Sequence, residues 1–220
     1  MNTYETMQRK AMGLALILGP LLLVLGSAAY VLGIGLTPFG TDSWVDGLFS
    51  AYGFLLMIPV SFELARILGQ RSPVFGLICA ILGLGWGMSA VAAVFKIVQM
   101  GIITAGLNES IWTVVESMPG VLLVVLPSML GMLGLLLLGL GLLWKGGIPR
   151  WAAGLLIVGT VFLVVGVGGG AESASWQTKV FTPLATVAYL AALAPIGMRY
   201  LTGGRQADGM GTTQAELTAA

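Results

Sequence analysis

Long, uninterrupted apolar segments are the feature that most restricts how this chain can fold. A helix needs about 20 apolar residues to cross a hydrocarbon core of about 30 Å. Because backbone polar groups in lipid must satisfy each other, each such segment is predicted to be a helix. A membrane β-barrel would instead show alternating segments of about ten residues. With only 9% charged residues against 57% hydrophobic ones, the chain could not cover a water-facing surface.

We therefore predict an all-α fold, an integral membrane bundle of six transmembrane helices in a domain of residues 11–201. With short connections, 220 residues hold six spans but not eight. The expected spans are about 11–35, 45–65, 74–99, 121–143, 151–167 and 180–198.

Three segments are expected to lie outside the lipid. Residues 1–10 are polar and should form a cytoplasmic N-terminus. Residues 109–117 are predicted to form a short interfacial helix on the outer side. The small, polar residues 202–220 should form a disordered cytoplasmic tail.

The lysine and arginine residues orient the bundle. If the N-terminus is placed inside, the outer side receives only Lys96 and Lys179. The inner side then receives Arg9, Lys10, Arg66, Arg71, Lys145, Arg150, Arg199 and Arg205. This asymmetry satisfies the positive-inside rule and predicts a multipass protein of the plasma (inner) membrane with both termini in the cytoplasm.

Two alternatives concern the organisation of the chain. Residues 1–29 could be a signal peptide cleaved after Ser27-Ala28-Ala29, although the apolar segment continues beyond that site. The sequences that open at Arg9 and at Arg150 are alike, each with Gly-Leu after the basic residue. A looser match, Gly76-Leu77, follows Arg71. Either the chain contains three repeated hairpins, or the likeness reflects only the general composition of glycine- and leucine-rich helices.

Missing residue types exclude much chemistry. The chain has no histidine, which removes the commonest ligand of zinc and haem iron and the usual catalytic base. Its single cysteine, Cys79, cannot form an intrachain disulfide. We expect no catalytic residues, no metal site and no cofactor. A net charge of +1 without a basic patch argues against nucleic acid as a partner.

Ionisable residues near the membrane are candidates for function. Asp46, Lys96 and Glu116 should meet at the outer end, with Asp46 the expected partner of Lys96. Glu63 and Arg66 are three residues apart, which favours an inner ion pair.

Two further patterns concern helix faces. Small or polar residues in the second span form a stripe that should face the bundle interior: Asp46, Ser50, Gly53, Met57 and Ser61. Gly83 and Gly87 have the GxxxG spacing that lets two membrane helices approach closely.

The turn between the fourth and fifth spans, Leu143-Trp-Lys-Gly-Gly-Ile-Pro-Arg-Trp-Ala-Ala-Gly154, resembles a turn in uncharacterised bacterial six-helix multipass membrane proteins. The resemblance covers about a dozen residues and the general layout. It implies a bacterial origin and no activity.

These observations favour a non-catalytic accessory or partner subunit that contacts the lipid bilayer and a membrane protein or a second copy of itself. The alternative is a small-solute or ion transporter or channel. It would use the outer cluster as a binding site and the stripe as a path.

Overall fold

The computed structural model describes residues 3–36, 43–106, 118–167 and 170–202. Its elements are α1 (Thr3–Val31), α2 (Trp44–Gly69), α3 (Pro73–Gly83), α4 (Gly85–Thr104), η1 (Pro119–Val121), α6 (Leu122–Lys145), α7 (Arg150–Val167) and α8 (Gly170–Thr202). Within the described residues, six helical segments are long and apolar enough to cross a membrane, with α3 and α4 forming one segment and η1 and α6 another. The predicted all-helical architecture is confirmed, with six helical segments of the length and apolarity that membrane spans need.

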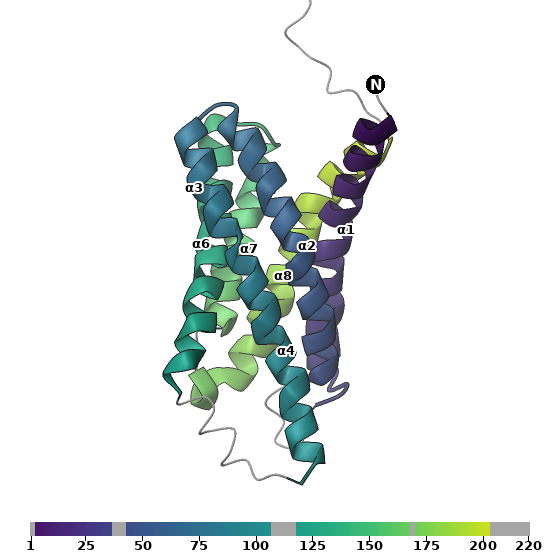
Figure 1. Ribbon diagram of the computed structural model, residues 1–220, viewed down its shortest axis with the longest axis vertical. Helices are drawn as coiled ribbons and strands as arrows, with labels where there is room; N and C mark the ends of the chain where they lie inside the picture. Colours follow the sequence, from purple (N-terminus) through teal and green to yellow (C-terminus); the bar gives the residue numbers. More distant parts are fainter. Residues whose placement is uncertain (1–2, 37–42, 107–117, 168–169, 203–220) are drawn as a thin grey trace, which may run out of the picture.

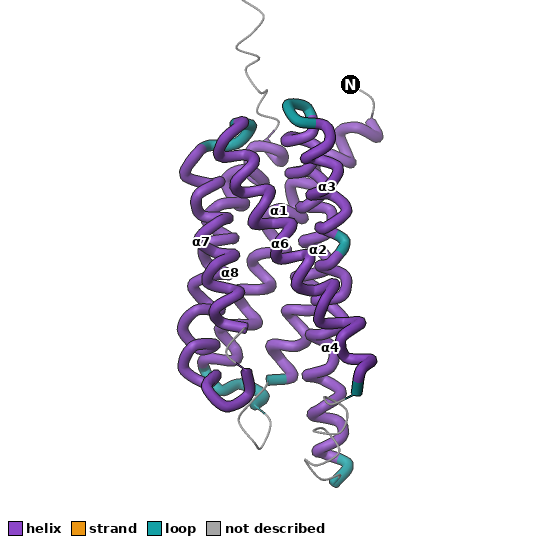
Figure 2. The backbone as a smooth tube through the Cα atoms, turned by 90° about the vertical axis from the view of Figure 1, so that its left-hand side faces the viewer, coloured by secondary structure: helices purple, strands orange, loops and turns teal. Residues whose placement is uncertain are grey.

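The spans form a closed ring in chain order. α1 contacts α2, α2 contacts α3 and α4, these contact α6, α6 contacts α7, and α7 contacts α8. α8 then returns to α1 and closes the ring. The helices run up and down along the long axis of the molecule, and α4 extends furthest at its lower end (Figures 1 and 2).

Both described chain ends, at Thr3 and Thr202, lie at the same end of the bundle as the α2–α3 and α6–α7 turns (Figure 1). We call this the terminal end and the other the opposite end. Large side chains from most of the spans fill the ring interior. Leu16, Met57, Trp86, Leu138 and Leu193 are all fully buried. The ring is therefore a packed bundle over most of its length.

The third span differs from the single helix expected over 74–99. It is interrupted at Leu84, and α4 continues to Thr104. Gly83 and Gly85 flank the interruption, and glycine weakens a helix because it loses more conformational freedom than other residues. At Gly85 the backbone of α4 also lies against Gly131 of α6, where a Cβ would lie 2.8 Å from the Gly131 Cα.

The first and last spans are longer than expected. α1 begins at Thr3 rather than at residue 11, so its first turns continue into the polar segment. It ends at Val31, before Gly33 and Gly35, whose φ angles of 74° and 66° suit glycine. α8 already begins at Gly170, where a connector was expected. The predicted interfacial helix 109–117 and tail residues 203–220 lie outside the described residues.

Candidate functional site

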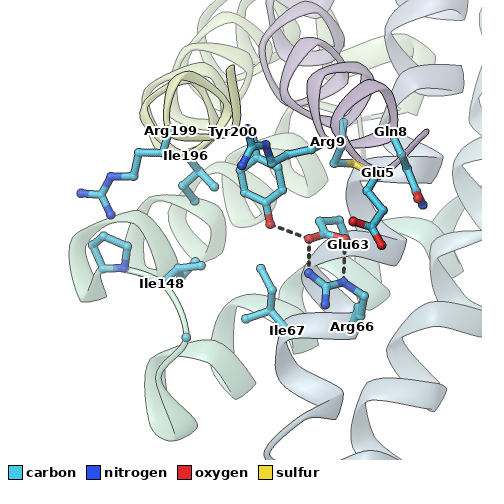
Figure 3. A pocket seen from close by; sticks show the side chains of 13 residues that line it. Glu5, Gln8, Arg9, Glu63, Arg66, Ile67, Ile148, Ile196, Arg199 and Tyr200 are labelled. Carbon is cyan, nitrogen blue, oxygen red and sulfur yellow. Dashed lines mark hydrogen bonds and ion pairs between the residues drawn. The ribbon is translucent and has the colours of Figure 1, made fainter. Parts of the chain in front are cut away.

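A cavity of about 880 Å³ opens at the terminal end of the bundle. Four parts of the chain line it: α1, α2, the α6–α7 turn and α8. Figure 3 shows Tyr200, Glu63, Arg66 and Glu5 lying close together, while the Arg199 side chain points away from this group. The lining residues are Glu5, Gln8, Arg9, Met12, Glu63, Arg66, Ile67, Gly147, Ile148, Pro149, Ile196, Arg199 and Tyr200.

Glu63 is the central acceptor of a hydrogen-bond network in one cavity wall. Only 9% of its surface is exposed, so its carboxylate needs partners. Arg66 donates from Nε to Oε2 at 2.9 Å and from Nη2 to Oε1 at 2.6 Å. The Tyr200 hydroxyl donates to the same Oε1 at 2.5 Å (Figure 3). The expected Glu63–Arg66 pair is thus present, and Tyr200 of α8 extends it into a three-residue network.

Arg9 contributes a cation with unused hydrogen-bonding capacity. Its Nε is buried, and no residue in the described part of the chain accepts a hydrogen bond from it. Arg199 lines the cavity from α8 with an exposed side chain. Glu5, also exposed, and Glu63 are the lining acids. Arg66 neutralises Glu63, and Glu5 offsets one of the two remaining arginine charges. The lining therefore carries one net positive charge.

A close contact between α1 and α8 brings together the helix segments that carry Arg9 and Arg199. Gly13 and Gly197 allow it, since a Cβ at Gly13 would lie 2.9 Å from the Gly197 carbonyl oxygen. The same Cβ would lie 2.9 Å from Tyr200 Cβ. Arg9 lies one turn before this contact on α1, and Arg199 lies just after it on α8.

The α6–α7 turn forms the facing wall. Gly146 and Gly147 have φ angles of 75° and 118°, a region that L side chains rarely adopt. Arg71 Nη1 donates to the Lys145 carbonyl oxygen and ties this turn to the α2–α3 turn. The turn brings half-buried Ile148 into the cavity lining.

At the opposite end, Lys96 meets Asp46, its expected partner. Lys96 Nζ lies 2.5 Å from Asp46 Oδ2, and the Ser50 hydroxyl donates to Asp46 Oδ1 at 2.8 Å. The carboxylate is largely buried, and Ser43 caps the same helix by accepting from the Asp46 amide. The third residue of the predicted cluster, Glu116, lies outside the described residues.

The stripe on α2 faces the bundle interior, as expected. Gly53 and Ser61 are buried with the rest of it, and Met57 is fully buried. A Cβ at Gly53 would lie 2.7 Å from Leu23 Cδ2, so α1 packs directly on the stripe. Helix packing therefore occupies these residues, and they do not line the 880 Å³ cavity.

Gly83 and Gly87 lie on α3 and α4, on either side of the interruption at Leu84, and both face α2. A Cβ at Gly83 would lie 2.8 Å from Ser61 Cβ, whereas one at Gly87 would meet only Ile58, at 3.6 Å. Gly83 thus packs against α2 within the chain and is not available to another protein.

The cavity itself could not be predicted from the sequence. Arg9 and Arg199 were considered only as topological charges, and Tyr200 was not singled out. One signal was present in the sequence, because the basic turn between Trp144 and Trp151 also supplies the cavity wall with Ile148.

Among the described residues, no group of three or more Cys, Asp or Glu side chains could hold a metal ion. Comparison of the chain with protein-family models, with curated proteins and with solved structures finds no match. The arguments about function therefore rest on the geometry of the site.

Proposed function

We propose that this chain is a non-catalytic accessory component of a bacterial plasma membrane that binds an anionic ligand in its terminal-end cavity. The observation that carries the proposal is the buried, unpartnered Nε of Arg9 in a cavity with net positive charge. A buried donor without a partner is costly, so a ligand that accepts from it gains binding energy. Anionic acceptors make the strongest such hydrogen bonds.

The distribution of charge supports a cytoplasmic location for this cavity. Among the described residues, Lys96 and Lys179 belong to the opposite end. The terminal end carries Arg9, Lys10, Arg66, Arg71, Lys145, Arg150 and Arg199. Cytoplasmic loops are enriched in lysine and arginine, so the terminal end is assigned to the cytoplasm. The three repeated hairpins remain a prediction within this topology.

A binding site at this end is better supported than a solute path along α2. The stripe residues are packed by α1, and Asp46 is engaged by Lys96 and Ser50. The cavity, in contrast, is open and polar on one side. The proposed accessory role still includes a partner protein. Gly83 does not contribute to the surface that would contact this partner, because it is packed against α2.

Gentle extraction followed by native mass spectrometry tests the proposal. The wild-type protein should retain an anionic adduct, and the Arg9→Gln/Arg199→Gln double variant should lose it. The control is Lys10→Gln/Arg150→Gln, which removes the same charge at the same end from residues that do not line the cavity. Equal adducts in all three proteins, or none in the wild type, would contradict the proposal.

A further inference from the structure

We propose that the anion bound in the terminal-end cavity is the phosphate-bearing headgroup of an anionic membrane phospholipid. This inference rests on the proposed function and names its ligand class. Three observations support it: the depth of the cavity, the arrangement of its charges and its mixed lining.

The depth follows from two tryptophans. Trp144 and Trp151 flank the α6–α7 turn and are 83% and 52% exposed. Tryptophan concentrates at the level of lipid headgroups, because one part of its ring system is apolar and the other donates a hydrogen bond. The intervening residues Gly147, Ile148 and Pro149 line the cavity. The cavity therefore lies at the depth of the headgroups of the surrounding leaflet.

The charges suit a phosphate rather than a cation. Of the two lining acids, Glu63 already accepts two hydrogen bonds from Arg66 and one from Tyr200, and the single charge of Glu5 is outweighed by those of Arg9 and Arg199. Further donors on the lining include Arg9 of α1, whose Nε has no partner among the described residues, and the exposed Arg199 of α8. Arginine is the residue best suited to phosphate, because its planar donors match the phosphate oxygens. Basic pockets between membrane helices on the cytoplasmic side bind anionic lipid headgroups.

The lining favours a lipid over a free anion. Met12, Ile67, Ile148 and Ile196 contribute apolar surface to the same cavity. A volume of about 880 Å³ lies in the range of sites for drug-sized molecules, about 300–1,000 Å³. A phosphate ion alone would leave most of this space and all of its apolar surface unused. A headgroup with its glycerol backbone uses both.

Soluble short-chain ligands test the inference on the intact protein in a neutral detergent. The probes are dihexanoyl-phosphatidylglycerol, dihexanoyl-phosphatidylcholine and inorganic phosphate, at equal concentrations, and the readout is the thermal unfolding midpoint. A ligand that binds only the folded protein raises this midpoint. We expect phosphatidylglycerol to raise it, while phosphatidylcholine and phosphate have little effect.

Variants link the shift to the cavity. In Arg9→Gln/Arg199→Gln the apparent affinity for phosphatidylglycerol should fall about tenfold or more, and in Lys10→Gln/Arg150→Gln it should be unchanged. Ile148→Trp narrows the cavity without changing its charge and should also reduce the shift. The midpoint of each variant without ligand shows whether it is folded.

The outcomes separate the inference from the function beneath it. If phosphate raises the midpoint as much as phosphatidylglycerol, and the double variant abolishes both shifts, the site binds soluble anions and the lipid inference is wrong. If phosphatidylglycerol acts equally on the wild type and on Arg9→Gln/Arg199→Gln, the cavity is not its site. If no anion binds in either experiment, the proposed function fails as well.

Discussion

The Tyr200 hydroxyl donates to Glu63 Oε1 at 2.5 Å and thereby joins the last span to the second. Tyr200→Phe removes only this hydroxyl and leaves the two hydrogen bonds of Arg66 in place. We expect it to lower the free energy of unfolding by about 1 kcal/mol. Titration with a denaturing detergent in mixed micelles measures the change. Tyr4→Phe is the control, because Tyr4 is 71% exposed, and an equal loss in both variants would contradict the prediction.

Lys96 and Asp46 provide a second test, at the opposite end. Lys96→Met removes the cation beside the largely buried Asp46 carboxylate and leaves its hydrogen bond from Ser50 in place. Because a buried charge without its counter-charge is destabilising, this variant should be less stable than the wild type. Lys96→Met/Asp46→Asn removes both charges and should be more stable than Lys96→Met alone. A double-mutant cycle should give a coupling energy of about 0.5–3 kcal/mol. A coupling energy of zero would show that the contact contributes nothing to stability.

Two glycines of α4 make a matched pair. At Gly85 an added Cβ would meet the backbone of α6 at Pro127 and Gly131, and backbone atoms cannot move aside cheaply. Gly85→Ala should therefore destabilise the protein by about 1–3 kcal/mol. At Gly101 an added Cβ would have no neighbour within 4 Å among the described residues.

Gly101→Ala should accordingly have the opposite sign. Alanine stabilises a helix interior by about 0.5–1 kcal/mol relative to glycine, because it restricts the unfolded chain more. Both variants can be compared in the same unfolding titration. If Gly85→Ala matched Gly101→Ala in sign, the close contact of α4 with α6 would be refuted.

Accessibility labelling tests the orientation. In a chain with Cys79→Ala, an impermeant thiol reagent applied outside intact cells should react with Asp42→Cys and Asn108→Cys. It should not react with Gln70→Cys or Gln206→Cys until the membrane is opened. The reversed pattern would place the terminal end and its cavity outside. Opposite exposure of positions 42 and 108 would contradict six spans.

Much of the fold could be predicted because lipid imposes simple rules on sequence. Apolar length marks each span, and contacts within one helix follow from spacing, as with Arg66 three residues after Glu63. The Lys96–Asp46 contact was also predictable, because neighbouring antiparallel spans place their ends together. The interruption at Leu84 was not, since it depends on the approach of α4 to α6 at Gly85.

The terminal-end cavity was beyond reach for a similar reason. Arg9 and Tyr200 lie almost the whole chain apart, and they share a site only because the ring closes. That closure depends on the fit of Gly13 against Gly197, and nothing in either helix alone names the other as its neighbour. The distribution of lysine and arginine along the chain indicated on which side of the membrane Arg9 and Arg199 lie, but not that they line the same cavity.

The closure of the ring by α8 has a consequence for biosynthesis. A ribosome delivers the spans in order, so α1 enters the membrane long before the helix that packs beside it. Until α8 arrives, Glu63 lacks the Tyr200 hydroxyl, and the cavity lacks the wall that carries Arg199. The cavity is thus completed only when α8 has inserted, and a nascent chain without α8 cannot form it. In the proposed function, an anion bound in the cavity therefore reports that α8 has packed against α1.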